Sequence, residues 1–374
     1  MDKLRLILLM VFAIICISVT GWGAEQVTSV VNNKYLTGHD YNVTEHSISI
    51  NKNNYFIAGR YETGAFESPN ILAFMTGKID NAGRIILNKK SIIGKVQWGN
   101  YTTLALNKNN RFIQVNLGQG SNQIYYNAGK IDPETGKITF TDSFTFHNNT
   151  GRFMKITLND DNQFVEVHEG KGSLMPWKNI KHLYYVIGNI DENGKIHKTG
   201  SGKYCGYGID PNISLNENIF VEVHRGPDSS KPYAIYGSID FENGKMNISK
   251  YSGQGVKISN DKIEDISSVH LKKIKIMDGD YYKVSVFEQL GNEIHEYKGN
   301  LTGTQSSNSW DLVDLSTKIY KINTKDNPTF TGSANDQYFI GVGVGQNYFD
   351  STSSYLIIPM ETQKVGAGES TEFL

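Results

Sequence analysis

One pattern in this chain recurs closely enough to restrict its fold. Phe164–His168 reads F-V-E-V-H and is followed by Leu183–Asp191, and the same order returns as Phe220–His224 and Tyr233–Asp240. Weaker copies begin at four further aromatic residues: Phe56, Phe112, Tyr282 and Phe339. Successive copies lie roughly 52 to 62 residues apart, a spacing typical of repeat architectures in which each unit packs against the next.

The third copy, which is the clearest, shows what one repeat contains. Alternating apolar and polar residues predict strands over 153–158, 164–168, 183–190 and 195–204, joined by segments rich in Asn, Asp and Gly. No segment after the N-terminal apolar run has a sustained helical period. Four antiparallel strands per copy predict an all-β fold, a single β-propeller of about six four-stranded blades. An open β-solenoid is the structural alternative.

The two ends of the chain predict how the ring closes. The last copy has strand patterns over 327–331, 338–344 and 354–360, followed by a polar tail, so it lacks a fourth strand. A spare strand-like segment lies near the N-terminus, over 26–36. We expect this N-terminal strand to join the last blade and close the ring, which leaves no exposed sheet edge between the first and last blades.

The N-terminus has the features of an export signal. Two basic residues precede an apolar run over 6–19, and small residues near Gly23 or Ala24 suit cleavage. The run, about 14 residues, is shorter than the roughly 20 that a membrane span needs, although a retained anchor is the alternative. We expect a secreted, extracellular protein with no membrane span after leader cleavage. The expected divisions are a signal peptide over 1–24, a propeller over 25–361 and a polar C-terminal tail over 362–374.

Charge and cysteine content exclude some functions. With 37 Lys and Arg against 38 Asp and Glu, the formal net charge is −1, which gives no electrostatic basis for binding nucleic acid. Cys205 is the only cysteine outside the leader, so no intrachain disulfide is expected in the mature protein. The Asp-containing turns lack the further ligands of a calcium loop, and no phosphate or dinucleotide motif occurs. We expect no metal and no cofactor, and nominate no catalytic residue.

The repeated pattern F-V-E-V-H, followed by Y-Y-x-x-G-x-I-D, resembles that of secreted bacterial β-propeller modules with V-E-V-H repeats. Such modules act as lectins or accompany toxins or hydrolases, so the resemblance implies binding or adhesion. It covers nearly all of the mature chain, but only the copies at Phe164 and Phe220 carry the Glu-x-His pair. The copy at Phe112 has Gln114 and Asn116 at those positions.

Glu166 with His168, and Glu222 with His224, are the most suggestive polar pairs. Residues two apart on a strand share a face, so each Glu and His project together. A carboxylate beside an imidazole could serve as an acid/base pair, a metal ligand set or a contact for a glycan. The alternative is that the pairs form hydrogen bonds between neighbouring blades, and their repetition favours this structural role.

Aromatic residues are expected to gather on one face of the ring. The loops between second and third strands are long, and in a propeller they share a face with the connections between blades. Flat rings beside polar groups suit sugars, although these aromatics could instead fill the grooves between blades. The candidate binding residues are Glu166, His168, Trp177, Glu222, His224, Arg225, Tyr233, Trp98 and Tyr207.

These features lead us to expect a secreted, non-catalytic protein that binds carbohydrate or a cell-surface partner through its long-loop face. Two alternatives stay open: a polysaccharide-acting glycoside hydrolase or lyase on a propeller scaffold, and a structural envelope or matrix protein. A deep central pocket holding two carboxylates roughly 5–10 Å apart would favour the hydrolase.

Overall fold

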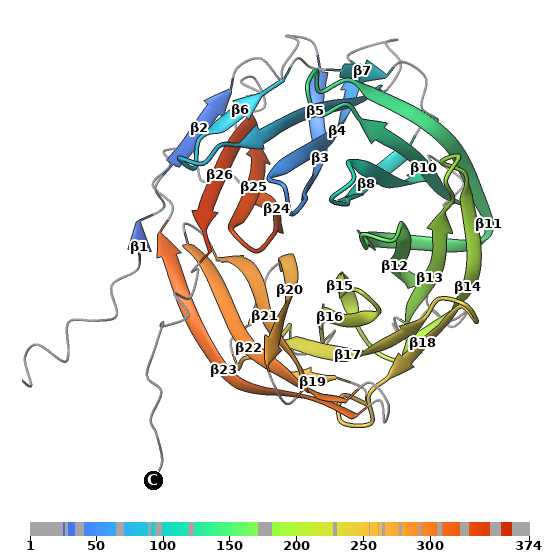
Figure 1. Cartoon of the computed structure of the whole chain (residues 1–374), viewed down its shortest axis with the longest axis vertical. Coiled ribbons are helices and arrows are strands. Elements are labelled where there is room, and N and C mark those ends of the chain that lie inside the picture. The colour runs from blue at the N-terminus through green and yellow to red at the C-terminus, as the bar shows by residue number, and fades with distance from the viewer. Residues whose placement is uncertain are drawn as a thin grey trace, which may run out of the picture.

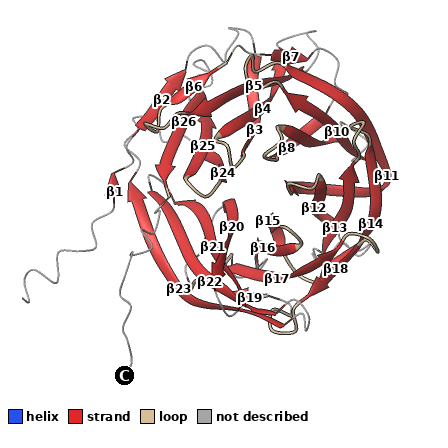
Figure 2. Ribbon diagram, in the orientation of Figure 1, coloured by secondary structure: helices blue, strands red, loops and turns tan. Residues whose placement is uncertain are grey.

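The computed structural model is a ring of β-sheet blades around a central axis (Figure 1). In the residues that it describes, the regular secondary structure is strand and no helix occurs (Figure 2). Accordingly, this part of the chain has no helix long and apolar enough to cross a membrane. The described residues are 25–26, 29–33, 41–64, 71–88, 91–93, 99–118, 123–170, 182–226, 230–253, 255–260, 262–263, 266–276, 279–290, 293–304, 309–321, 329–344 and 353–360.

Each blade is a sheet whose first strand lies nearest the axis, and its strands are antiparallel except for the short outermost strand of blade 5, which pairs in parallel (Figure 1). Blade 1 contains β3 (Tyr41–Ile50), β4 (Tyr55–Gly64), β5 (Ile71–Ile79), β6 (Ile85–Leu87) and β7 (Ser91–Ile93). Blade 2 contains β8 (Gly99–Leu106), β9 (Arg111–Gly118), β10 (Gln123–Ile131) and the first part of β11 (Ile138–Leu158). Blade 3 contains the rest of β11, β12 (Gln163–Gly170), β13 (Leu183–Ile190) and β14 (Ile196–Cys205).

Blades 4 to 6 follow the same plan, with additional short strands at the outer edges. Blade 4 contains β15 (Ile209–Asn216), β16 (Ile219–Arg225), β17 (Pro232–Asp240), β18 (Lys245–Ile248) and β19 (Val256–Lys257). Blade 5 contains β20 (Ile266–Ile276), β21 (Gly279–Leu290), β22 (Glu293–Thr304), β23 (Ser309–Lys321) and β1 (Glu25–Gln26). Blade 6 contains β24 (Thr329–Ala334), β25 (Tyr338–Val344), β26 (Ser353–Pro359) and β2 (Ser29–Asn33).

The innermost strands form an unbroken circuit. β3 contacts β8, β8 contacts β11, β11 contacts β15, β15 contacts β20, β20 contacts β24, and β24 contacts β3. The predicted all-β propeller of six four-stranded blades is therefore confirmed, and an open solenoid is excluded because the first and last blades touch. β2 pairs with β26 in blade 6, from Ser29 opposite Ile357 to Asn33 opposite Ser353. That this strand is what holds the ring closed stays a prediction.

One strand differs from the sequence-based expectation. We expected the strand at 153–158 to begin a new blade after a separate connection. Instead, β11 runs for 21 residues, pairing with β10 in blade 2 over its first part and with β12 in blade 3 over its last part. The outermost strand of one blade thus continues directly into the innermost strand of the next. The polar residues in the middle of β11 also adopt extended backbone. In the sequence, a polar stretch of this kind looks the same whether it forms a strand or a loop.

The aromatic residue that opens each sequence copy is a core residue. All of these side chains are at most 1% exposed, namely Phe56, Phe112, Phe164, Phe220, Tyr282 and Phe339. The recurrent glycine on the third strand makes room for this ring, because a Cβ at Gly129 would lie 2.5 Å from Phe112 and one at Gly188 would lie 2.5 Å from Phe164. Burying one such ring contributes about 1.5–3 kcal/mol. The repeat therefore encodes the core of each blade.

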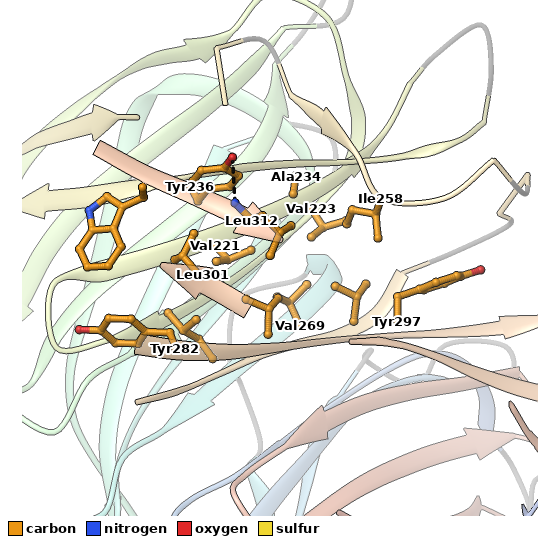
Figure 3. Close-up of a cluster of buried hydrophobic side chains, with 14 of the residues drawn as sticks. Val221, Val223, Ala234, Tyr236, Ile258, Val269, Tyr282, Tyr297, Leu301 and Leu312 are labelled. Carbon is orange, nitrogen blue, oxygen red and sulfur yellow. Dashed lines mark hydrogen bonds between the residues drawn. The ribbon is translucent and has the colours of Figure 1, made fainter. Parts of the chain in front are cut away.

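Neighbouring blades bury apolar side chains against each other, as Figure 3 shows between blades 4 and 5. Val221 and Val223 of β16 lie against Val269 of β20 and Leu301 of β22 in one cluster. Tyr236 adds a polar contact within it. Its hydroxyl accepts a hydrogen bond from the Leu312 backbone N–H at 3.3 Å and lies 3.4 Å from the Asp311 carboxylate. Burial raises the pKa of Tyr236 to about 12.

This raised pKa predicts an alkaline loss of stability. The neutral hydroxyl contributes fully below its ordinary pKa of 10.0, and the contribution is lost as the pH rises to about 12. We expect Tyr236→Phe to lower the free energy of unfolding by about 1 kcal/mol near neutral pH. The same variant should lose less stability than the wild type between pH 10 and 12. Denaturant unfolding at several pH values checks this, and parallel pH profiles for the two proteins would contradict it.

Candidate functional site

A pocket of about 490 Å³ lies inside the ring, lined by all six innermost strands and the turns that follow them. Its wall repeats a pattern in which polar and small side chains alternate with mostly apolar ones and an Asn follows. The clearest copies are S-I-S-I-N at 47–51, T-L-A-L-N at 103–107, K-I-T-L-N at 155–159, N-I-S-L-N at 212–216 and T-G-S-A-N at 331–335. Five blades therefore supply a similar polar segment to one central space, and Ser268 and His270 of blade 5 line the same space.

The polar side chains of this pattern form hydrogen bonds with backbone groups of the neighbouring blade. An innermost strand is a sheet edge, so one side of its backbone lacks a partner strand. Ser47 of blade 1 accepts a hydrogen bond from the Leu104 N–H of blade 2 at 3.0 Å. Asn212 of blade 4 likewise donates to the Ile266 carbonyl of blade 5 at 3.0 Å. Side chains of one blade thus cover the open edge of the next.

The Asn residues that follow these strands extend the same connection around the ring. Their side-chain amides donate to backbone carbonyls of the next blade. The bonds are Asn335 to Asn51 at 2.7 Å, Asn51 to Asn107 at 2.9 Å, Asn107 to Asn159 at 3.3 Å, Asn159 to Glu217 at 3.0 Å and Asn216 to Leu271 at 3.1 Å. Between blades 5 and 6, His270 lies 3.1 Å from Asp336. The turns at this end of the pocket are therefore held together by side-chain bonds.

Each Asn also shapes its own turn. The Asn107 side-chain oxygen accepts from the backbone N–H groups of Asn109 and Arg111 at 3.0 and 3.1 Å. Asn110 adopts a left-handed conformation with φ 58°, which Asn tolerates better than most residues. The turns of blades 1 and 3 repeat this arrangement at Asn51 and Asn159. One residue type therefore meets both the local and the inter-blade requirement.

Several hydroxyl groups in the wall remain available. The side chains of Thr157, Ser214 and Ser268 line the pocket and have no hydrogen-bond partner among the described residues. They lie on three consecutive blades, at positions that alternate with buried apolar residues such as Ile213. Neutral hydroxyl groups spaced along a wall of this kind match a ligand that is itself rich in hydroxyl groups.

Charged side chains line the pocket at the end where the Asn turns lie. We call this region the turn end, and its charged residues are Lys52, Lys108, Asp160, Asp161 and Glu217. The Asp160 carboxylate lies 3.0 Å from the Lys52 ammonium and 3.6 Å from that of Lys108. Burial disfavours the ionised form of Asp160, but the hydrogen bonds from Lys52 and from the Lys108 backbone outweigh it and lower its pKa. Asp160 is therefore held as a carboxylate near neutral pH.

Two further carboxylates share the turn end. Glu217, whose side chain is 59% exposed, forms an ion pair of 2.8 Å with Lys273. Its backbone carbonyl accepts the hydrogen bond from Asn159, which brings the turn of blade 4 against that of blade 3. Asp161 is exposed, and its carboxylate has no partner in the described part of the chain. The turn end of the pocket thus carries three carboxylates, Asp160, Asp161 and Glu217.

The predicted pair Glu166 and His168 lies elsewhere, inside the wall between blades 2 and 3. Both side chains are at most 1% exposed. The imidazole Nδ1 of His168 lies 3.0 Å from the Glu166 carboxylate, and the Tyr126 hydroxyl of blade 2 donates to the same carboxylate at 3.3 Å. The His168 ring also stacks on Tyr184, with 5.8 Å between the ring centres. These contacts are those of the structural alternative, hydrogen bonding between neighbouring blades.

The second pair repeats this environment in blade 4. His224 Nδ1 lies 3.0 Å from Glu222, and its ring stacks on Tyr233 with 6.1 Å between the ring centres. Burial and the Glu222 carboxylate together raise the pKa of Tyr204 of blade 3. Arg225 forms an ion pair with Asp210 of its own blade. A ligand contact by these residues stays a prediction.

The remaining predicted binding residues divide into two groups. Tyr207 is 39% exposed on the connection between blades 3 and 4, which fits a surface role. Trp98 and Trp177 lie outside the described residues, as does most of the long-loop face. The long loops therefore provide no geometry for a site. The charges and hydroxyls of the pocket were not on the sequence-based candidate list.

Metal and thiol chemistry find little support in the described residues. No group of three or more His, Cys, Asp or Glu side chains among them could hold a metal ion. Cys205 is 2% exposed, and burial raises the pKa of its thiol. A thiol with a raised pKa has little thiolate near neutral pH and is a weak nucleophile. Carboxylate chemistry at the turn end is the remaining candidate.

Comparison with known proteins gives no family for this chain. No family model and no curated protein matches the chain. Among solved structures, a Trypanosoma rangeli sialidase in complex with the inhibitor DANA has TM-score 0.47 and 11% identity, and covers 89% of this chain. The chain spans only 58% of that sialidase. The α-L-arabinofuranosidase of Fusarium graminearum with arabinobiose has TM-score 0.46 and 11% identity, over 89% of this chain and 98% of that one.

These comparisons correct the expectation of a non-catalytic binding protein. Both proteins are named as enzymes, a sialidase and an arabinofuranosidase, and this agrees with the glycoside hydrolase alternative rather than with the main expectation. At 11% identity and TM-scores below 0.5, the similarity carries no argument about the activity of this chain. Any activity therefore has to be argued from the pocket of this chain.

The buried Glu166 yields a prediction about stability. Glu166→Ala leaves the Tyr126 hydroxyl and the His168 imidazole without their shared buried partner, so we expect the free energy of unfolding to fall by about 3 kcal/mol or more. Glu134→Ala, in an exposed turn, is the matched control and should change it by less than about 0.5 kcal/mol. Urea unfolding of both variants provides the measurement. An equally small effect at Glu166 would show that the pair does not join the blades.

Proposed function

We propose that this protein is a glycoside hydrolase that acts on polysaccharide in the axial pocket. The observation that carries the proposal is the composition of that pocket, in which free hydroxyl groups on three blades lead to three carboxylates at the turn end. Its volume of about 490 Å³ lies within the roughly 300–1,000 Å³ of small-molecule sites. The wall suits the hydroxyl groups of a sugar, and the turn end suits acid/base chemistry.

The carboxylates divide into the two roles that glycoside hydrolysis requires. Asp160, whose pKa the neighbouring lysines lower, is the ionised carboxylate that activates water or stabilises positive charge at the anomeric carbon. Asp161 or Glu217 donates the proton to the leaving oxygen. The glycosidic C–O bond breaks as the acid protonates the leaving oxygen, and water supplies its hydroxyl to the anomeric carbon. Asp160 accepts the remaining water proton, and proton exchange with solvent returns both carboxyl groups to their starting states. The carboxylates lie on turns of adjacent blades, so the reaction requires an intact ring.

Export forms part of the same proposal. The leader predicted over 1–24 lies outside the described residues, and secretion would bring the protein to polysaccharide outside the cell. A glycan is accordingly the partner that we propose. The resemblance to V-E-V-H propeller modules, some of which accompany hydrolases, is compatible with this function.

The test is release of reducing ends from a panel of plant, fungal and bacterial polysaccharides. We expect activity on at least one of them, and we expect Asp160→Asn to lower kcat by roughly 10²- to 10⁴-fold. Asp161→Asn and Glu217→Gln identify the acid, because only one of them should lower the rate comparably. Glu134→Gln, in an exposed turn outside the pocket, is the control and should retain full activity.

Two results would overturn the proposal. One is the absence of sugar release from every polysaccharide in the panel by folded protein. The other is an Asp160→Asn variant that is as active as the wild type. Thermal unfolding of each variant distinguishes loss of chemistry from loss of the fold.

A further inference from the structure

Three innermost strands begin with an unusual backbone conformation. Tyr101 in blade 2, Phe153 in blade 3 and Asp210 in blade 4 have φ of 58°, 52° and 49°. Each lies at a register shift between the first and second strands of its blade. Left-handed backbone at a bulky aromatic residue is rare and costs about 1–3 kcal/mol. Its recurrence at one place in successive blades calls for a physical reason.

In blades 2 and 3 this conformation brings two aromatic rings together. The rings of Tyr101 and Phe153 lie with their centres 5.5 Å apart and their planes at 59°. Tyr101 is 36% exposed, so one of the largest side chains at the start of these strands remains open to solvent. Phe153 is partly buried, so the pair packs ring against ring while keeping part of its aromatic surface open to solvent.

The position of the pair relates it to the pocket. Tyr101 and Phe153 each precede by two residues a residue of the pocket wall, Thr103 and Lys155. The turn end lies at the other end of the same strands, about 20 Å further along extended backbone. Neither ring lines the pocket itself, so the aromatic pair lies beyond the end of the pocket wall that is opposite the carboxylates.

Arg152 completes this surface without adding net charge. Its guanidinium carbon lies 5.5 Å from the centre of the Phe153 ring. Its Nε and Nη2 groups donate to Glu169 Oε1 at 2.9 and 2.6 Å, and the Glu169 side chain is fully buried. The positive charge is thus balanced by a fixed carboxylate, while half of the arginine side chain remains exposed. The surface is aromatic and polar at its edge, and Glu169 balances the charge of its arginine.

We propose that Tyr101 and Phe153 form a platform on which a neutral sugar ring stacks, as part of a glycan chain that continues through the axial pocket. The apolar C–H face of a sugar fits an aromatic ring, and the exposed edge of Arg152 suits its hydroxyl groups. Because the platform and the carboxylates lie about 20 Å apart, the ligand is an oligosaccharide and not a single sugar. The proposal rests on the proposed function for the use of the pocket.

The test exploits the backbone strain. Tyr101→Asn removes the ring but suits the left-handed conformation, as Asn54, Asn110 and Asn162 show with φ between 58° and 63°. The control is Tyr251→Asn, which removes another exposed tyrosine, 53% accessible, between β18 and β19 on the outer side of blade 4. Both changes are made in the Asp160→Asn background so that the ligands are not cleaved. The ligands are neutral hexasaccharides of glucose, xylose and arabinose, and the corresponding monosaccharides.

Calorimetric titration should show that at least one hexasaccharide binds much more tightly than its monosaccharide. Tyr101→Asn should weaken this binding at least tenfold without lowering Tm, whereas Tyr251→Asn should leave it unchanged. The inference is wrong if no hexasaccharide binds, if Tyr101→Asn binds as the parent does, or if Tyr101→Asn lowers Tm by several degrees with unchanged affinity.

This measurement separates the two proposals. Titration needs no turnover, so binding that depends on Tyr101 in a protein that releases sugar from no polysaccharide would overturn the hydrolase and keep the platform. Conversely, activity that depends on Asp160 and is indifferent to Tyr101 in both KM and kcat would overturn the platform alone.

Discussion

The structure depends on how six exposed strand edges around one axis are satisfied. An innermost strand has backbone groups that no further strand pairs, and leaving them buried without partners would cost about 1–3 kcal/mol each. Here the partners are side chains of the neighbouring blade, such as Ser47 on the Leu104 N–H and Asn51 on the Asn107 carbonyl. These side-chain hydrogen bonds therefore satisfy the open strand edges and also connect neighbouring blades.

The same solution produces the pocket. Positions that face a neighbouring edge have to be short and polar, so large apolar side chains do not fill the axis. Where a hydroxyl is not needed by the backbone, as at Thr157 or Ser214, it remains available to a ligand. The turns that carry Asp160 and Glu217 lie on adjacent blades and are joined by the hydrogen bond from the Asn159 amide to the Glu217 backbone carbonyl. A structural requirement thus creates a polar cavity with carboxylates at one end.

Much of the fold could be predicted from the sequence because the relevant signals are local. The alternation of residues around Phe164 and the turn at Asp191 identify strands and hairpins, and their recurrence gives the number of blades. The site could not be predicted in the same way. Asn107 looks like a turn residue in isolation, and its bond to Asn159 joins positions 52 residues apart. Conversely, Glu166 and His168 stand out in the sequence because the pair returns as Glu222 and His224, yet both pairs are buried within the blades and away from the pocket.

The central claim, that a glycan occupies the axis, is most directly tested by a crystal structure of the Asp160→Asn variant soaked with a bound hexasaccharide. The account predicts sugar units along the axial pocket, within hydrogen-bond distance of Thr157 and Ser214 and extending toward the turn end. Sugar bound only on the outer strands or grooves between blades, with the axial pocket empty, would contradict it.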